Sequence, residues 1–225
     1  MMERNIKPYK GKIDKKERWQ LNNHKSVLIW FTGLPGSGKS TISHELEYLL
    51  FENKIRTYVL DGDNVRRGLC KDLGFSAEDR RENLRRVGEV AKLFVDAGIL
   101  TIASFASPYI SDRKMIREMF GNEEFIEVYL KCDISVCEKR DPKGLYKKAR
   151  NGIIKNFTGV SDPYEAPEKP EILLETDKLT VEQSVKSVFD FLGWKIVSPR
   201  EFTITLSSVK YSASVPYKYR ALRSR

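Results

Sequence analysis

The chain has 225 residues, of which 40% are hydrophobic and 32% are charged, with a formal net charge of +9. This is the size and composition of one soluble globular domain with a sizeable core. No apolar run approaches the ~18 residues that span a bilayer, and no apolar stretch follows the Lys-rich N-terminus, so we expect neither a membrane anchor nor a signal peptide. Three scattered cysteines and two histidines exclude a disulfide framework, a histidine-based triad and a zinc site, and they suit a cytoplasmic location.

The positive charge has two explanations. One is binding to nucleic acid, and the other is a site for two polyanionic small molecules together with basic tails. The basic residues cluster after Arg140 and at the two termini, rather than along one face studded with aromatic residues. We therefore expect small-molecule substrates, with no nucleic acid and no membrane among the partners.

Taken in chain order, the hydrophobic pattern predicts strands that alternate with helices. Residues 1–25 are expected to form a basic arm that packs on the domain through Trp19 and Leu21. Strands are expected at 27–32, 57–60, 99–105, 125–131 and 172–174, and helices at 39–53, 76–97, 111–120, 135–140 and 180–192. Ser76 is expected to cap its helix, and Gly98 and Gly193 to end theirs. The alternation predicts an α/β fold in which helices cover both faces of a parallel sheet.

A phosphate-binding loop follows the first predicted strand. Its residues are Gly33-Leu34-Pro35-Gly36-Ser37-Gly38-Lys39-Ser40, which match the pattern G-x-x-x-x-G-K-S/T between a strand and a helix. The glycines let backbone N–H groups point at phosphate oxygens, and the helix N-terminus adds partial positive charge. Lys39 is expected to reach the β- and γ-phosphates and Ser40 to hold Mg²⁺. A glycine-rich turn without a ligand is the alternative.

A basic, loop-rich segment spans residues 141–170. It contains three glycines and four prolines, and no acidic residue lies between Asp141 and Asp162. A segment of this kind inside a compact domain is usually a lid or a binding loop. We predict that it forms a basic lid over the site.

Two aspartates follow the second predicted strand, at Asp61 and Asp63. A kinase needs a carboxylate beside the acceptor hydroxyl and oxygen ligands for Mg²⁺. The alternative is an Asp-Gly turn with a helix cap at Asn64. Because ligands bind at the carboxyl ends of parallel strands, the P-loop, this turn and the loop at Ser107 are expected to converge on one crevice.

Arginines and loop aromatics supply further candidates. The arginines Arg66, Arg80, Arg85 and Arg86 follow the aspartate turn, and arginine forks suit phosphate or sulfate oxygens. For Arg85 and Arg86 a solvated helix face is the alternative. Phe75 and Phe157 lie in predicted loops, where aromatics are poor core candidates and two of them could clamp a planar base. Packing in the core is the alternative for each.

Several of these segments together resemble the adenylylsulfate (APS) kinase family of P-loop kinases. The similar stretches are Trp30-Phe31-Thr32-Gly33, Asp61-Gly62-Asp63-Asn64-Val65-Arg66, residues 71–76, residues 79–86, Ser104-Phe105-Ala106-Ser107-Pro108, residues 141–146, Lys155-Asn156-Phe157-Thr158-Gly159 and residues 162–167. The resemblance covers about residues 15–195. It implies transfer of the γ-phosphoryl group of ATP to the 3′-hydroxyl of APS, which gives 3′-phospho-APS in sulfate assimilation, and it implies a homodimer.

The resemblance also implies a role for each matching residue. Residues 33–41, from Gly33 to Thr41, would bind the ATP phosphates, Arg140 would lie over the ATP adenine, and Ser40 and Asp61 would serve Mg²⁺. Asp63 would be the base at the 3′-hydroxyl. The residues expected to bind APS are Asp63, Asn64, Arg66, Phe75, Arg80, Asn83, Ala106, Ser107, Lys147, Phe157 and Thr158. Ser107 matches a serine described in the family as a phosphoserine intermediate, but direct in-line transfer needs only positioning, Mg²⁺ and a base.

The expected organisation is a basic arm at 1–25, a P-loop domain at 26–197 with its lid at 141–170, and a basic extension of unknown role at 198–225. Within the extension, residues 201–206 alternate like an edge strand. A kinase for another small metabolite, and an NTP-driven switch or nucleic-acid-binding ATPase, are the alternative functions.

Overall fold

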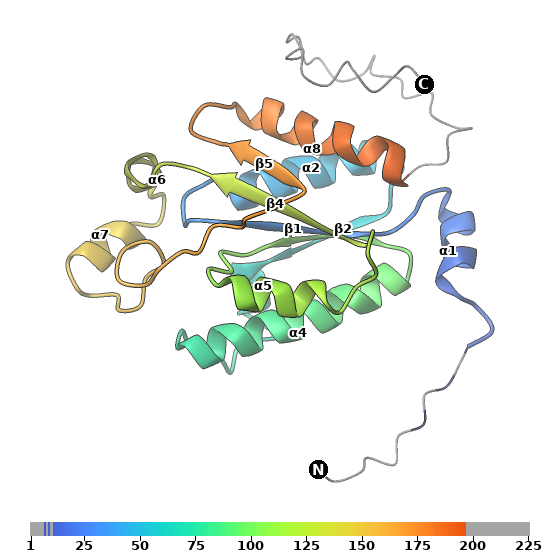
Figure 1. The fold of residues 1–225 in the computed structure, drawn as a ribbon, viewed down its shortest axis with the longest axis horizontal. Helices are drawn as coiled ribbons and strands as arrows, with labels where there is room; N and C mark the ends of the chain where they lie inside the picture. Colours follow the sequence, from blue (N-terminus) through green and yellow to red (C-terminus); the bar gives the residue numbers. More distant parts are fainter. Residues whose placement is uncertain (1–6, 8, 10, 197–225) are drawn as a thin grey trace.

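The computed structural model describes residues 7, 9 and 11–196, which form a parallel five-stranded sheet of order β2-β3-β1-β4-β5 (Figure 1). The strands are β1 (Leu28–Gly33), β2 (Thr57–Asp61), β3 (Leu100–Ser104), β4 (Phe125–Lys131) and β5 (Ile172–Glu175). The helices are α1 (Lys15–Asn22), α2 (Lys39–Glu52), α3 (Gly62–Val65), α4 (Ala77–Asp96), α5 (Ile110–Arg117), α6 (Ile134–Arg140), α7 (Leu145–Arg150) and α8 (Val181–Ile196). Helices α2 and α8 cover one face and α4 and α5 cover the other, which confirms the predicted fold class.

Strand β1 lies at the centre of the sheet, and all of its residues are buried. An unbroken apolar run is typical of a parallel strand that is covered on both faces. Ile29 and Phe31 pack in the core with α2 and α8, whereas Leu28 and Trp30 pack in the core with α4 and α5. The P-loop therefore leaves the middle of the sheet at its carboxyl edge.

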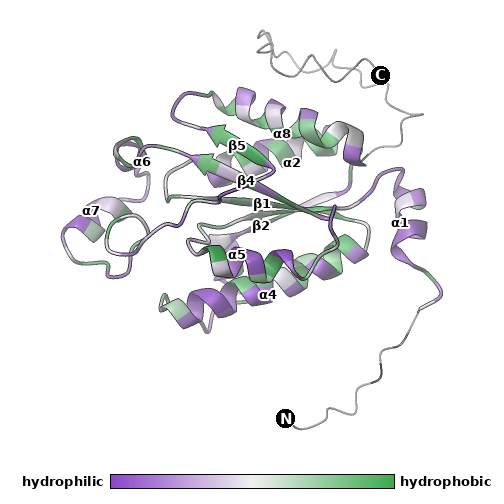
Figure 2. Ribbon diagram, viewed as in Figure 1, coloured by the Kyte–Doolittle hydropathy of each residue, from purple (hydrophilic) through white to green (hydrophobic). Residues whose placement is uncertain are grey.

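Helix α4 has the amphipathic character that its sequence predicts, apolar toward the sheet and polar outward (Figure 2). Val87 and Ala91 are among its buried residues. The Ser76 hydroxyl caps the helix by accepting a hydrogen bond from the Asp79 backbone N–H at 3.1 Å, and the helix ends just before Gly98. The predicted start and end of this helix are confirmed.

Helix α8 does not end at Gly193 as predicted but continues to Ile196. Both Leu192 and Ile196 are buried in the core, and the Ile196 carbonyl accepts a hydrogen bond from the Lys25 N–H at 2.7 Å. Glycine costs a helix interior only about 1 kcal/mol, which this packing outweighs.

The basic N-terminal arm contains a helix, α1, that the sequence reading did not predict. Asp14 and Glu17 form a reciprocal capping box at its start. Trp19 is an anchor as expected, because its indole N–H donates to the Ser26 hydroxyl at 2.6 Å. Leu21 is 83% exposed, so the prediction that it anchors the arm is wrong.

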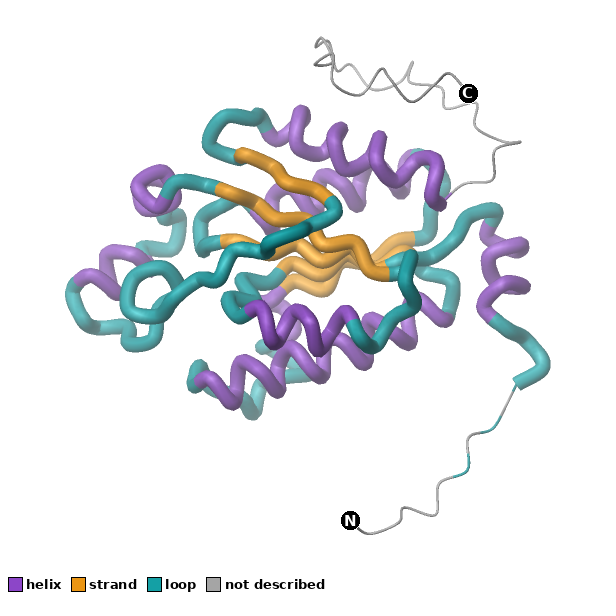
Figure 3. The backbone as a smooth tube through the Cα atoms, viewed as in Figure 1, coloured by secondary structure: helices purple, strands orange, loops and turns teal. Residues whose placement is uncertain are grey.

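The lid is mostly loop around the short helix α7 (Figure 3). That helix starts where the Asp141 carboxylate accepts the N–H groups of Leu145, at 2.8 Å, and Tyr146, at 2.9 Å. The strand expected at 201–206 and the extension 198–225 lie outside the described residues, so the domain boundaries stay predictions. Within 11–196, no helix combines the length and the apolar character needed to cross a bilayer.

Candidate active site

The P-loop joins β1 to α2 in a conformation that its glycines permit. At Gly33 an added Cβ would lie 2.6 Å from the Leu130 carbonyl oxygen. At Gly36 the φ angle is +78° and an added Cβ would lie 2.9 Å from the Cys137 carbonyl oxygen. Gly38 is the N-cap of α2 and offers no side-chain cap, so the first-turn N–H groups can bind phosphate oxygens.

Lys39 is half-buried at the base of this loop. Its ammonium donates to the carbonyls of Gly33, at 2.9 Å, and Leu34, at 2.8 Å. Burial lowers the pKa of Lys39 to about 8, because a low-dielectric site disfavours the charged amine. The nearby Ser37 hydroxyl is buried without a hydrogen-bond partner among the described residues. The loop thus has a cation and a spare donor beside its backbone N–H groups, as a phosphate-binding site requires.

Ser40 and Asp61, the two residues expected to serve Mg²⁺, are in direct contact. The Ser40 hydroxyl donates to Asp61 Oδ2 at 2.7 Å, and Asp61 Oδ1 accepts the Asp63 N–H at 3.0 Å. Asp61 is therefore also the N-cap of α3, in place of the cap considered at Asn64. In the described part of the chain, no three His, Cys, Asp or Glu residues are grouped to hold a metal. One hydroxyl and one carboxylate fit Mg²⁺, which usually takes few protein ligands and completes its shell with water and substrate phosphates.

Asp63 lies next in the chain, and the lid reaches it. The Lys143 ammonium forms an ion pair and a hydrogen bond with Asp63 Oδ2. Lys143 was not among the predicted site residues, although it lies in the basic segment that predicted the lid. Lys147, the lid lysine that was predicted, is an exposed residue of α7 whose backbone N–H donates to Asp141 at 3.3 Å.

The residues expected to bind the acceptor meet between the start of α4 and the lid. Arg80 donates to the Phe75 carbonyl at 3.0 Å, to the Thr158 hydroxyl at 3.0 Å, and to the Asn156 carbonyl. The Arg66 guanidinium lies 4.4 Å from the centre of the Phe75 ring, and burial lowers its pKa. Phe75 is 64% exposed, so one face of an aromatic platform is available beside two arginines.

Phe157 differs from the expectation for a loop aromatic. It is only 8% exposed and packs in a small core with Tyr146, Ala149 and two cysteines. Its ring meets Tyr146 edge to face, with centroids 5.0 Å apart. The alternative considered for Phe157, packing in a core, is therefore what the structure shows, because lid residues pack together with Cys132 and Cys137.

Asn83 on α4 and Arg140 at the end of α6 are two further predicted site residues. Asn83 is buried on α4, and its amide nitrogen has no hydrogen-bond partner in the region described. Arg140 donates to the Thr176 carbonyl at 2.6 Å, and the Thr176 hydroxyl donates to the Ser37 carbonyl at 2.9 Å. Arg140 is thus connected to the P-loop through one residue.

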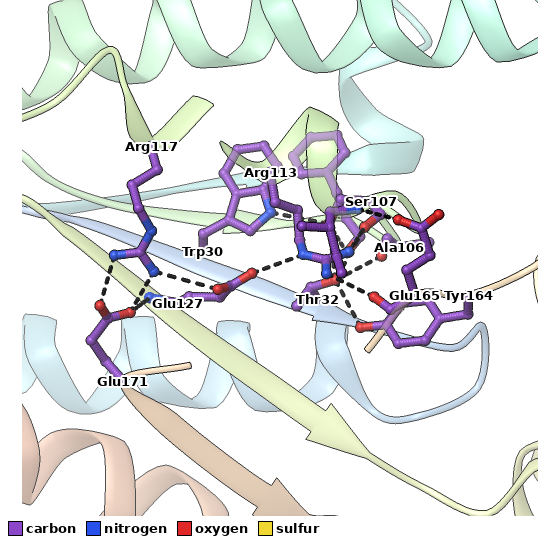
Figure 4. Close-up of polar contacts among 12 residues, drawn as sticks. Trp30, Thr32, Ala106, Ser107, Arg113, Arg117, Glu127, Tyr164, Glu165 and Glu171 are labelled. Atoms are coloured by element: carbon purple, nitrogen blue, oxygen red, sulfur yellow. Dashed lines mark hydrogen bonds and ion pairs between the residues drawn. The ribbon is translucent and has the colours of Figure 1, made fainter. Parts of the chain in front are cut away.

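Ser107 lies in a buried hydrogen-bond network behind the site (Figure 4). Its hydroxyl accepts from the Trp30 indole N–H at 3.0 Å and donates to the Thr32 hydroxyl at 3.0 Å. Thr32 donates to the Ala106 carbonyl at 2.8 Å and lies 3.0 Å from the Tyr164 hydroxyl. Sequence reasoning found Ala106 and Ser107 but missed the other three residues, because only the fold brings them together.

A hollow of about 570 Å³ opens between the P-loop and the end of the lid. Leu34, Ile134, Gly159 and Tyr164 are among its lining residues. Its size is that of a typical small-ligand pocket. The P-loop, the aspartate turn and the Ser107 loop all lie at the carboxyl ends of β1, β2 and β3, as predicted.

Comparison with known proteins identifies the family. The family model for adenylylsulphate kinase matches residues 25–175. An adenylyl-sulfate kinase of Staphylococcus epidermidis is 60% identical over 182 residues, covering 81% of this chain and 92% of the relative. One of Thermodesulfovibrio yellowstonii is 61% identical over 173 residues, covering 77% of this chain and 86% of the relative. The structure of the Mycobacterium tuberculosis APS kinase in complex with AMPPNP and APS is 44% identical, with a TM-score of 0.72, covering 75% of this chain and 98% of that one. Because a family model matches more than half of the chain and close relatives cover most of it, this chain belongs to the adenylylsulphate kinase family.

Proposed function

We propose that this adenylylsulfate kinase transfers the γ-phosphoryl group of ATP to the 3′-hydroxyl of adenosine 5′-phosphosulfate, giving ADP and 3′-phosphoadenylylsulfate for sulfate assimilation. The observation that carries the assignment of roles is the arrangement at one sheet edge. The P-loop with Lys39 and Ser40 forms a donor half, and Asp63, Phe75 and Arg80 border an acceptor half. A two-substrate phosphotransfer needs these two halves to meet.

On the donor side, residues 33–41 cradle the ATP phosphates, and Lys39 neutralises charge on the β- and γ-phosphates. Ser40 and Asp61 would hold Mg²⁺, which supplies further charge neutralisation. Arg140 would lie against the ATP adenine, a role that its connection to Ser37 through Thr176 supports.

On the acceptor side, Asp63 accepts the proton of the 3′-hydroxyl as the phosphoryl group arrives. Lys143 orients that carboxylate through their ion pair. Arg66 and Arg80 provide guanidinium groups for the phosphosulfate, and Phe75 stacks on the APS adenine. A supporting set completes the acceptor half: Asn64, Asn83, Ala106, Lys147, Phe157 and Thr158.

Ser107 positions the acceptor rather than carrying a phosphoryl group. Its hydroxyl is buried and already bonded to Trp30 and Thr32. Reaching the γ-phosphate would break both hydrogen bonds. A buried polar group that loses its partners costs about 1–3 kcal/mol, and direct transfer to the 3′-hydroxyl avoids this cost.

A coupled assay that follows ADP release with APS as acceptor tests the reaction. Asp63→Ala is expected to lower kcat by about 10²–10⁴-fold, the range of a lost general base. Asp72→Ala is the matched control, because Asp72 is an exposed aspartate that pairs with Arg86. Turnover with another acceptor but none with APS would refute the substrate assignment, and a near-normal rate for Asp63→Ala would refute the assignment of the base.

We also propose a cytoplasmic homodimer without nucleic-acid partners. Family membership is the support for the dimer. Light scattering at several protein concentrations measures the oligomeric state, and a monomer mass throughout would contradict it.

A further inference from the structure

Arg113 on α5 is a buried arginine behind the proposed acceptor site, and its side chain is only 4% exposed. Its guanidinium makes three hydrogen bonds in diverging directions (Figure 4). The Nε atom donates to Glu127 Oε1 at 2.9 Å, Nη1 donates to the Ser107 carbonyl at 2.6 Å, and Nη2 donates to the Glu165 carbonyl at 2.7 Å. One side chain therefore joins β4, the acceptor loop at residues 105–110, and the end of the lid.

Further contacts fasten the same end of the lid, which we call the lid anchor (Tyr164 and Glu165). The Glu165 N–H donates to the Pro108 carbonyl at 2.8 Å, and its carboxylate accepts the Ile110 N–H at 2.7 Å. The Tyr164 hydroxyl lies 3.0 Å from the Thr32 hydroxyl. Because the hollow beside the P-loop is lined by residues 159–164, the place of the lid anchor sets the shape of that hollow.

A buried charge is costly unless it is fully paired. Even a fully paired buried ion pair is often no more stabilising than apolar side chains packed in its place. Two of the three hydrogen bonds of Arg113 go to backbone carbonyls, one in the acceptor loop and one in the lid anchor. Only one goes to its carboxylate partner. A lysine could not span these acceptors, because it lacks the rigid planar fork. The geometry favours a role in placing the two segments over a role in stability alone.

We propose that Arg113 is a positioning residue for the acceptor substrate: it holds the acceptor loop and the lid anchor at a fixed separation, so that APS binding depends on it and ATP binding does not. The inference rests on the proposed function, because it assigns this wall of the site to the acceptor. Arg113 contacts no P-loop residue in the hydrogen bonds and ion pair described here. Loss of Arg113 is therefore expected to weaken APS binding and to leave ATP binding unchanged.

Arg117, one turn along α5, offers a matched control. It pairs with Glu127 Oε2 at 3.4 Å and with both carboxylate oxygens of Glu171, at 2.7 and 2.8 Å. It shares the Glu127 partner with Arg113, but its bonds run to Glu171 instead of the acceptor loop. Loss of Arg117 should therefore disturb the ion-pair network without moving the acceptor site.

Steady-state kinetics of Arg113→Met, Arg113→Lys and Arg117→Met test the proposal. Arg113→Met is expected to raise KM for APS by about tenfold or more, since small displacements of a positioning wall can cost up to about 10²-fold, while KM for ATP stays within about twofold. Arg113→Lys should recover only part of the loss, and Arg117→Met should resemble the wild type. An unchanged KM for APS in Arg113→Met, or an equal rise in Arg117→Met, would overturn the proposal.

Limited trypsin cleavage within residues 143–155 gives a readout that needs no turnover. Arg113→Met should speed this cleavage at least about threefold over Arg117→Met, because a loosened anchor opens the lid locally; equal rates would count against the proposal. If Arg113→Met does not fold, Tyr164→Phe loosens the same anchor by one hydroxyl and should raise KM for APS selectively. If the wild-type enzyme does not phosphorylate APS, the proposed function is refuted. The trypsin experiment still tests the role of Arg113 in holding the lid anchor, because it does not depend on turnover.

Discussion

Raising the pH from 7.5 to 9.5 should weaken ATP binding through Lys39. Burial holds the pKa of this ammonium near 8, and only its charged form attracts the β- and γ-phosphates. ATP binding restores a high pKa by placing negative charge beside the amine, so above pH 8 binding must be accompanied by proton uptake. Between pH 7.5 and pH 9 the protonated fraction before binding falls from roughly three quarters to roughly one tenth, so the affinity should fall about eightfold, or about 1.3 kcal/mol.

Two measurements check this expectation. The pH profile of kcat/KM for ATP reports groups of the free enzyme and should bend downward near pH 8. Calorimetry of ATP-analogue binding at pH 8.5, in two buffers of different ionisation heat, should show net proton uptake. Circular dichroism over the same pH range controls for unfolding. A profile that stays flat to pH 9.5, with no proton uptake, would refute a lysine of lowered pKa in the P-loop.

Two further predictions address the P-loop and the pH dependence of stability. Gly36→Ala should weaken ATP binding by about tenfold or more, because its Cβ would meet the Cys137 carbonyl at 2.9 Å in a left-handed conformation; Gly68→Ala, where a Cβ meets nothing within 4 Å, is the control, and equal affinities would contradict the crowding argument. Burial lowers the pKa of His24 below 6.5, and its Nε2 accepts the Arg56 N–H at 3.0 Å. The unfolded chain then binds the extra proton first, so the free energy of unfolding should fall as pH drops from 7 to 5, by up to about 1.4 kcal/mol per pH unit from this group. Denaturant titrations should show a smaller fall in the free energy of unfolding for His24→Gln than for the wild type. Equal falls in the two proteins would count against this role of His24.

The sequence predicted the sheet and its helices well, because their patterns are local. Strand β4 has the predicted bounds, Phe125–Lys131, and α4 begins after the predicted cap. The misses lie where tertiary contacts outweigh local preference. Helix α8 passes Gly193 because Ile196 is buried, and Leu21 is exposed although it is apolar.

In the candidate site too, residues set by a local motif were predictable, and residues set by tertiary contacts were not. Lys39 and Ser40 were predictable because a contiguous motif dictates the donor half. Lys143, Thr32 and Tyr164 were not, because each acquires its contact only when distant segments meet: Lys143 with Asp63, and Tyr164 with Thr32. A pattern of residue types along the chain carries no information about such pairs.

The lid and the P-loop are in direct contact, and this contact connects the two halves of the site. The Tyr146 hydroxyl donates to the Pro35 carbonyl at 2.9 Å, and the backbone at Gly36 lies against the Cys137 carbonyl. Tyr146, Cys137 and Phe157 belong to one small core. Because Cys137 and Leu34 lie outside the lid, this core joins the lid to α6 and to the P-loop. Phe157, a predicted acceptor residue, therefore packs in the same small core as the P-loop residue Leu34, whereas the residues that Arg113 contacts lie outside that core.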